Sequence, residues 1–291
     1  MSEPSQRPFA VVAPCHPYNP TRLQEGLDLA KRRGWNLQAL PNLLRPHLHL
    51  AADDTHRRAQ LVEALSSPAY AGVWLARGGS GLTRLLRTLP WSELPNRPVI
   101  GFSDGTALLS ALDAHRGGTL IHGPVVNSLP DTTEDALEHL DHVLHGRNTQ
   151  PLSGDVWVGG YAAGPIIGGN LSVLAAMCGT PWQPDARGKI LLLEEIGEPA
   201  YRIDRLLQQL ADAGVLRDVA GIALGGFTSC SPPKGATWTL RELLLEQLGQ
   251  HNVPVVGDLP FGHISNNYAI PIGAHGTLRD GKLSWSPPVE A

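Results

Sequence analysis

The residues best suited to chemistry form a glycine-rich turn around a serine. Residues 101–105 read Gly-Phe-Ser-Asp-Gly, between an apolar pair at 99–100 and an apolar run at 107–109. This order is typical of a strand, a sharp turn and a helix, in which the Ser103 hydroxyl projects above a sheet and the flanking glycines tolerate strained dihedrals. The first helical amides would stabilise an anion formed there. An ordinary turn, in which Ser103 or Asp104 only caps the helix, is the alternative.

A serine nucleophile requires a base within hydrogen-bond reach and a third group that orients the base. Among the 12 histidines, His263 is the best candidate, because it lies in a loop after a predicted strand, where an imidazole can be exposed. A capping or surface role is the alternative for His263. Surface or structural roles account for His47, His49, His56 and His122.

Two adjacent carboxylates, Glu194 and Glu195, end an apolar strand predicted over 189–195. Charged residues in this place usually turn into solvent, but a carboxylate at the end of a buried strand can also accept a histidine N–H. Neighbouring side chains on a strand point to opposite faces, so only one of the two can face His263, and we expect Glu194 to do so. The order Ser103, Glu194, His263 is shared with the α/β-hydrolases and does not decide the fold.

No group of residues predicts a metal or cofactor site. The histidine spacings match no zinc pattern, and the glycine turn at 78–81 lacks both the Lys-Ser/Thr of a P-loop and the spacing of a dinucleotide turn. The three cysteines, Cys15, Cys178 and Cys230, are far apart and do not suggest a disulfide framework. We therefore expect no metal, no cofactor and a reducing, cytoplasmic environment.

Composition narrows the class of protein further. The chain has 291 residues, 42% of them hydrophobic and 17% charged, which suits two ordinary globular domains or one large one. The formal net charge of -4 predicts neither a nucleic-acid nor an anionic-membrane partner. No apolar run approaches the roughly twenty residues of a membrane span. Residues 1–7 lack the basic start and apolar core of a signal peptide.

The serine turn requires a sheet to carry it, and the first part of the chain predicts one. Apolar runs alternate with helical stretches, which is typical of a doubly wound parallel sheet. Sites in such sheets form at the carboxyl ends of strands, where both the glycine turn at 78–81 and the serine turn lie. The predicted strands are 9–14, 35–37, 72–76, 99–102 and 117–124, and the predicted helices include 21–30, 51–65 and 82–89.

A polar segment rich in Gly, Pro, Asn and Ser predicts a linker at 146–160. It would join an N-terminal α/β domain at 1–145 to a C-terminal domain at 161–291. The remaining predicted elements are helices at 133–144, 201–213 and 240–248, strands at 189–195, 221–227 and 253–257, and short antiparallel strands within 268–285.

The combination of motifs resembles the LD-carboxypeptidases, serine peptidases that include murein tetrapeptide carboxypeptidases and microcin C self-immunity proteins. Each motif is weak alone, but nine of them occur in one order along nearly the whole chain. They are Val11-Val12-Ala13-Pro14, Ala76-Arg77-Gly78-Gly79-Ser80-Gly81, Gly101-Phe102-Ser103-Asp104-Gly105-Thr106-Ala107-Leu108, His122-Gly123-Pro124, Gly168-Gly169-Asn170-Leu171, Gly179-Thr180-Pro181-Trp182, Leu193-Glu194-Glu195-Ile196-Gly197-Glu198, Tyr201-Arg202-Ile203-Asp204-Arg205 and Leu259-Pro260-Phe261-Gly262-His263.

The resemblance implies an N-terminal doubly wound α/β domain that carries Ser103 and a β-rich α/β C-terminal domain that carries Glu194 and His263, with the site between them. Three positions depart from the family's usual residues. Glu195 stands where Asp is usual, Ser80 where Tyr is common, and Cys15 where Ser is frequent. Nothing around Cys15 supports a cysteine nucleophile.

We expect acyl transfer, with Ser103 as nucleophile and His263, held by Glu194, as base. The expected oxyanion donors are the amides of Asp104 and Gly79. The candidate substrate-binding residues are Arg77, Asn170 and Arg202.

The expected function is removal of the terminal D-alanine from murein tetrapeptides in cytoplasmic cell-wall recycling. A small peptide is thus the expected partner, with no nucleic acid and no membrane, and the expected assembly is a homodimer. Alternatives are a peptidase that cleaves microcin-like peptidyl nucleotides, an α/β-hydrolase esterase, and a non-catalytic α/β module that binds a sugar or nucleotide.

Overall fold

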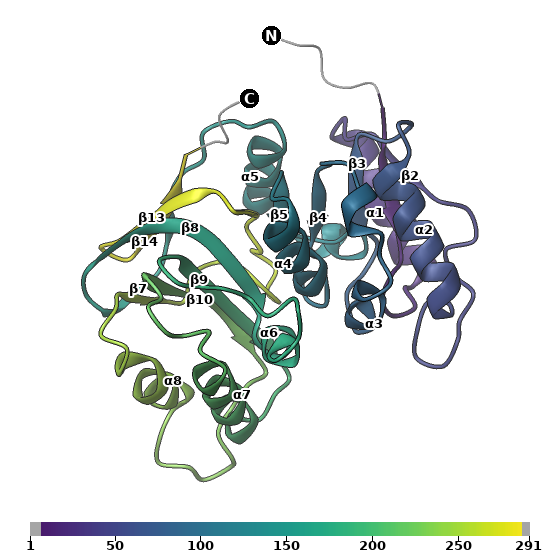
Figure 1. Cartoon of the computed structure of the whole chain (residues 1–291). Coiled ribbons are helices and arrows are strands. Elements are labelled where there is room, and N and C mark those ends of the chain that lie inside the picture. Colours follow the sequence, from purple (N-terminus) through teal and green to yellow (C-terminus); the bar gives the residue numbers. More distant parts are fainter. Residues whose placement is uncertain (1–6, 287–291) are drawn as a thin grey trace. The chain divides into compact units, whose positions relative to one another are not determined.

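The computed structural model describes residues 7–286 and divides the chain into two compact units, Met1–Thr132 and Thr133–Ala291. The prediction about a signal peptide concerns residues 1–7, of which the first six lie outside the described residues. Among the described residues, no helix is both long and apolar enough to cross a membrane. The first unit contains a parallel sheet, and the second unit contains a larger mixed sheet (Figure 1).

In the first unit, five parallel strands lie side by side in the order β2-β1-β3-β4-β5. Strands β1, β3, β4 and β5 are almost wholly buried because they are short apolar runs that helices cover on both faces. The doubly wound parallel sheet predicted from the sequence is therefore confirmed. The strand bounds are β1 (Phe9–Val12), β2 (Leu37–Ala39), β3 (Gly72–Leu75), β4 (Val99–Gly101) and β5 (Leu120–His122).

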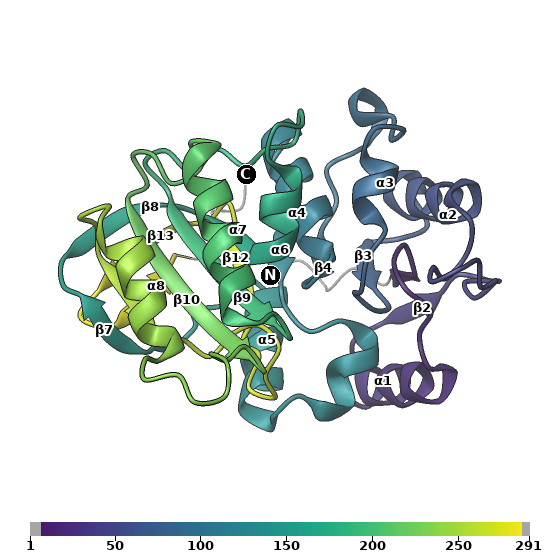
Figure 2. The ribbon, with the colours of Figure 1, turned by 90° about the horizontal axis from the view of Figure 1, so that it is seen from below.

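The helices of the first unit divide between the two faces of its sheet. Right-handed crossovers place the helix after β1 on one face and the helices that follow β2, β3 and β4 on the other. In agreement, α1 packs against the 3₁₀ segment η2, whereas α3 packs against both α2 and α4, and Figure 2 shows α1 apart from α2 and α3. The bounds are α1 (Pro20–Arg32), α2 (Asp54–Ser66), α3 (Leu82–Leu86), η1 (Trp91–Glu93), α4 (Gly105–His115) and η2 (Val126–Asp131).

The second unit contains an eight-stranded mixed sheet in the order β6-β14-β13-β8-β9-β10-β11-β7. Its centre, β8 to β11, is parallel, and antiparallel strands extend it on both sides. The bounds of these strands are β6 (Leu152–Ser153), β7 (Asp155–Val158), β8 (Tyr161–Asn170), β9 (Ile190–Ile196), β10 (Gly221–Thr228), β11 (Val255–Gly257), β13 (His275–Arg279) and β14 (Lys282–Trp285), and β12 (Ile270–Ile272) also lies in this unit.

The core of the second unit lies between the parallel strands and three helices, α6 (Leu171–Met177), α7 (Ala200–Asp212) and α8 (Leu240–Gly249). These helices cover one face of the sheet (Figure 2). The spacing of Ile203, Leu207 and Leu210 puts all three on one face of α7, where they are buried against the strands. A fourth helix, α5 (Glu134–Leu144), begins the unit. The β-rich α/β domain expected in this half of the chain is confirmed.

The predicted boundaries between elements differ from the structure in three places. The division of the chain falls at 132/133 rather than near 145. The segment expected as a linker, 146–160, contains β6 and β7, which are two and four residues long and partly exposed, so neither shows the pattern of a strand. Strand β8 was not predicted, because Gly164, Pro165, Gly168 and Gly169 normally interrupt strands; a Cβ at Gly168 would lie 2.2 Å from the carbonyl oxygen of Leu192.

A buried histidine in the second unit predicts acid sensitivity. Burial lowers the pKa of His139 to about 4, although its Nε2–H donates to the Ala269 carbonyl at 3.0 Å. Because the unfolded chain binds this proton with a pKa of about 6.5, the free energy of unfolding should fall by about 3 kcal/mol as the pH drops from 6.5 to 4. Urea titrations of His139→Gln, which keeps an N–H donor, should show a shallower fall over this range. Equal slopes for both proteins would contradict the prediction.

Candidate active site

Ser103 lies at a strained turn between β4 and α4. Its φ of 62° is in the left-handed region, which is rare for a residue with a side chain and recurs at functional sites. The strain therefore falls on the serine and not, as the sequence suggested, on its flanking glycines. Gly101 and Gly105 are needed for space instead, because an added Cβ would lie 2.6 or 2.9 Å from Leu75 Cδ1. The α4 N-terminus has no side-chain cap, so capping does not explain this turn.

The glycine turn after β3 lies directly against Ser103. A Cβ on Gly78 would lie 2.7 Å from Cβ and 2.8 Å from Oγ of Ser103, so a larger residue here would displace the hydroxyl. Gly79 adopts a φ of 119° and packs on the His16 ring, which in turn contacts the Ser80 hydroxyl at 2.8 Å. Close contact with the serine thus accounts for Gly78, and the approach of the His16 ring accounts for Gly79, without phosphate binding.

Two backbone amides of the first unit are candidate donors for an oxyanion. The amides of Gly79 and Asp104, which we expected in this role, have no hydrogen-bond partner among residues 7–286. Unpartnered N–H groups at the start of a helix and in a glycine turn are suited to a negatively charged oxygen. The two turns approach each other at Gly78, the residue before Gly79, where an added Cβ would be 3.5 Å from the Asp104 nitrogen.

In the second unit, His263 and Glu194 form a hydrogen-bonded pair. Glu194 is wholly buried near the end of β9, and its Oε2 accepts the Nδ1–H of His263 at 2.7 Å. With the proton on Nδ1, Nε2 of the imidazole carries the lone pair that a general base requires. The preceding Gly262 is required, since its φ is 99° and an added Cβ would lie 2.7 Å from Glu194 Oε2. Thr228 holds the loop by donating its hydroxyl to the His263 carbonyl at 2.7 Å.

Glu195 points to the other side of β9 and has a different set of partners. Its carboxylate accepts the N–H and hydroxyl of Ser172 at 2.8 and 2.6 Å and the amide group of Asn170 at 3.0 Å. These bonds tie the strand to the start of α6. Asn170 also caps that helix by accepting the Val173 N–H at 3.1 Å. Both Asn170 and Glu195 therefore have a structural role, which the sequence did not reveal.

The two arginines singled out from the sequence differ in their charge environment. Arg202 pairs with Glu198 at 2.9 Å, which neutralises its charge. Arg77 is exposed, and its guanidinium donates to the Pro17 carbonyl at 2.5 Å, with no carboxylate partner among residues 7–286. Arg77 also begins the glycine turn that contacts Ser103. It is the better candidate for a cation that binds a substrate carboxylate.

Cys15 is poorly suited to act as a nucleophile. Its side chain is fully buried, and burial together with the Asp104 carboxylate raises the pKa of the thiol well above its ordinary value. The reactive thiolate is thereby disfavoured.

Of the histidines given surface or structural roles, His122 is buried, and the His56 ring bonds the Asn42 carbonyl at 2.8 Å.

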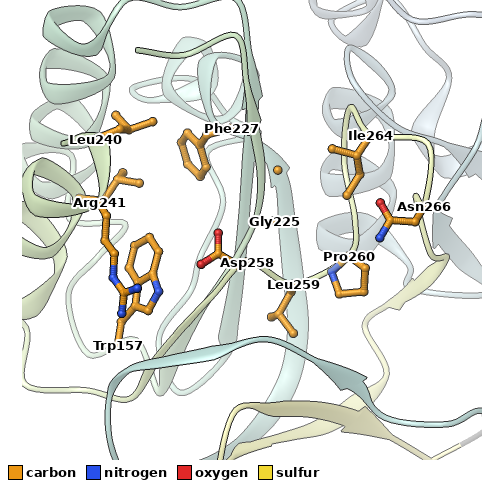
Figure 3. Close-up of a pocket in the computed structure, with 12 residues that line it drawn as sticks. Trp157, Gly225, Phe227, Leu240, Arg241, Asp258, Leu259, Pro260, Ile264 and Asn266 are labelled. Atoms are coloured by element: carbon orange, nitrogen blue, oxygen red, sulfur yellow. The ribbon is translucent and has the colours of Figure 1, made fainter. Parts of the chain in front are cut away.

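A cavity of about 390 Å³ lies beside the loop that carries His263. Figure 3 shows Asp258 between Trp157 and Arg241 on one side and Pro260 on the other. The Arg241 guanidinium lies 4.9 Å from the centre of the Trp157 ring. The sequence did not predict this cavity, because β7, α8 and the loop are far apart along the chain and no spacing signals that they meet.

No cluster of three or more His, Cys, Asp or Glu side chains able to hold a metal occurs among residues 7–286. Exhaustive dialysis against a chelator should therefore leave hydrolytic activity unchanged, since the serine chemistry requires only the protein's own groups. The measurement is the turnover rate before and after dialysis. Loss of activity that added zinc restores would refute this prediction.

A serine on a strained strand–helix turn, unpartnered amides beside it and a His–Glu pair are the parts of a serine hydrolase. The family description of the LD-carboxypeptidase N-terminal domain matches residues 9–123, and that of the C-terminal domain matches residues 163–278. The chain belongs to the LD-carboxypeptidase family and is a serine-type carboxypeptidase.

The chain is similar to individual relatives over most of their length. The chain is 34% identical to the murein tetrapeptide carboxypeptidase of Pseudomonas aeruginosa over 301 residues, covering 97% of this chain and 96% of the relative. The crystal structure of muramoyltetrapeptide carboxypeptidase from Oxalobacter formigenes matches with a TM-score of 0.84 and 30% identity, covering 94% and 96% of the two chains. The microcin C7 self-immunity protein MccF shares the fold, with a TM-score of 0.86 at 20% identity over 98% and 97%.

Proposed function

We propose that this carboxypeptidase removes the terminal D-alanine from murein tetrapeptides. The observation that carries the proposal is the 34% identity over 97% of the chain to a murein tetrapeptide carboxypeptidase, together with the serine turn and the His–Glu pair. In this mechanism Ser103, His263 and Glu194 act as one triad, which requires Ser103 Oγ to come within hydrogen-bond reach of His263 Nε2.

The reaction is an acyl transfer in two steps. His263 Nε2 takes the proton of Ser103 as Oγ attacks the carbonyl before D-alanine, while Glu194 holds the imidazole through Nδ1–H. The amides of Gly79 and Asp104 stabilise the oxyanion, and His263 then protonates the departing amine. After D-alanine leaves, His263 takes a proton from water as the water oxygen attacks the acyl-enzyme carbonyl. The ester bond to Ser103 Oγ then breaks, and His263 returns the proton to Oγ.

Recognition of the substrate's free carboxylate is assigned to Arg77. Its charge has no carboxylate partner among the described residues, whereas Arg202 is already paired with Glu198. A guanidinium can bind both oxygens of a planar carboxylate. Asn170 is not assigned to the substrate, because both ends of its amide already bond within the protein.

Cleavage of peptidyl nucleotides is the second candidate function. The fold neighbour MccF has been crystallised with aspartyl sulfamoyl adenosine and with glutamyl sulfamoyl guanosine, but its identity to this chain is 20%. The higher identity to murein peptidases favours the murein peptide.

A competition assay tests this choice of substrate. The murein tetrapeptide, its all-L isomer and a microcin-like aminoacyl adenylate analogue are supplied in equal amounts, and the products are followed by mass spectrometry. Release of D-alanine from the tetrapeptide should dominate. Preferential cleavage of either other compound would overturn the substrate assignment and leave the triad standing.

A cytoplasmic role in wall recycling belongs to the same proposal. It is supported by the free state of Cys15, Cys178 and Cys230, which suits a reducing compartment. Fractionation of cells that carry the native gene tests it, and recovery outside the cytoplasm would contradict it. The homodimer stays a prediction that sedimentation equilibrium can measure.

A further inference from the structure

The side chain of Asp104 has no step in the proposed mechanism, although its backbone amide does. The side chain is only 4% exposed. Its Oδ2 accepts the backbone N–H of Leu82 at 2.9 Å, and the carboxylate lies close enough to the Cys15 thiol to raise the pKa of that thiol. Burying a carboxylate is costly unless its bonds are well made, so these contacts require an explanation.

The two contacts join three segments that are separate in the sequence. Cys15 follows β1, Leu82 ends the glycine turn after β3, and Asp104 belongs to the serine turn after β4. Helix α3 begins at Leu82, and its N-cap, Gly81, has no side chain to satisfy the first amides. The Asp104 carboxylate supplies that acceptor from the serine turn.

Arg57 forms hydrogen bonds with two of the same segments, the one that follows β1 and the glycine turn. Its side chain is 1% exposed, and its guanidinium donates to the carbonyls of Pro14 and Gly81, the latter at 3.2 Å. Gly81 has a φ of 121°, and an added Cβ would lie 2.8 Å from Arg57 Nη1. The glycine turn is thus bonded at its end to two buried charged side chains.

The segments joined by Asp104 are the ones that carry the two unpartnered amides. Gly79 lies in the glycine turn three residues before Leu82, and the Asp104 amide lies in the serine turn. An oxyanion site is effective only when its donors are fixed at the position where charge develops. We propose that the Asp104 carboxylate, with the Cys15 thiol, is a positioning group that sets the spacing of the Gly79 and Asp104 amides; this inference rests on the proposed mechanism.

Four substitutions test the positioning role. Asp104→Ala removes the acceptor and keeps the backbone amide, so kcat should fall by about 10²-fold while KM changes less than about twofold. Asp104→Asn keeps an acceptor for Leu82 and should lose less than about tenfold. Cys15→Ala should lower kcat a few-fold. Cys15→Ser keeps an O–H donor and should restore that loss in kcat.

Two control variants separate positioning from folding. Leu112→Ala opens a cavity in the buried face of α4, and Asp28→Asn changes an exposed carboxylate on α1. Intact sites in every protein are counted by complete labelling with a fluorophosphonate, and kcat is expressed per labelled site. A merely structural role would lower the number of sites and leave kcat per site unchanged, as expected for Leu112→Ala.

The outcomes distinguish this inference from the proposed function. A kcat per site for Asp104→Ala within about twofold of the parent protein would overturn the positioning role and leave the triad standing. If Asp104→Ala yields no labelled sites, the Cys15 pair decides, and equal kcat per site in Cys15→Ala and Cys15→Ser would overturn the positioning role. If the parent protein releases no D-alanine, the substrate assignment fails, and the rate constant of fluorophosphonate labelling at Ser103 replaces kcat, with the same ranking of variants expected.

Discussion

Replacing Ser103 by alanine should lower kcat by a factor on the order of 10⁶, because the nucleophile of a triad carries nearly all of its covalent catalysis. The fold should be nearly unaffected. The backbone strain at a φ of 62° is similar for serine and alanine. Gly78 approaches closely, but the alanine side chain is smaller than the serine side chain and fits the same space. The measurement is kcat for D-alanine release, paired with the melting temperature of each protein.

Ser80→Ala is the matched control, since it removes a hydroxyl from the neighbouring glycine turn and leaves the nucleophile in place. It breaks the contact with His16 and should have a small effect on kcat. Substantial turnover in Ser103→Ala, or labelling of a different residue by a serine-directed reagent, would remove Ser103 from the mechanism.

Glu194→Gln should lower kcat by about 10⁴-fold, because a neutral amide neither fixes the His263 tautomer nor stabilises the imidazolium. The adjacent Glu195→Gln should affect turnover only mildly. It weakens bonds to Ser172 and Asn170, so its effect should appear in the free energy of unfolding, at about 1–3 kcal/mol.

The pair forms its own control, since both substitutions make the same chemical change on opposite faces of one strand. Kinetics and urea unfolding of both variants give a ranking for each property. If Glu195→Gln lowered kcat more and Glu194→Gln lowered the free energy of unfolding more, Glu195 would replace Glu194 as the carboxylate of the triad.

The sheets were largely predictable because buried parallel strands are short apolar runs, and β1, β3, β4, β9 and β10 have that character. Strand β8 escaped prediction because close packing against Leu192 selects a glycine where strand propensity opposes one. Edge strand β7 escaped because it has only four residues, none of them buried.

The features of the candidate site also divide into those that the sequence could predict and those that it could not. Ser103 and His263 lie in turns after strands, so local sequence indicated them. Alternation along a strand indicated that only one of Glu194 and Glu195 can face His263, and the expected one, Glu194, is the residue that bonds it. The Asp104–Cys15 contact and the cavity beside Trp157 depend on which distant segments meet, and no local pattern carries that information.

The central claim is that this LD-carboxypeptidase acts through Ser103 on the terminal D-alanine of murein tetrapeptides. The most direct test incubates a muropeptide mixture with the protein or with Ser103→Ala and compares the products by mass spectrometry. We predict conversion of tetrapeptides to tripeptides with release of D-alanine by the parent protein alone. Unchanged tetrapeptides, or equal conversion by Ser103→Ala, would contradict it.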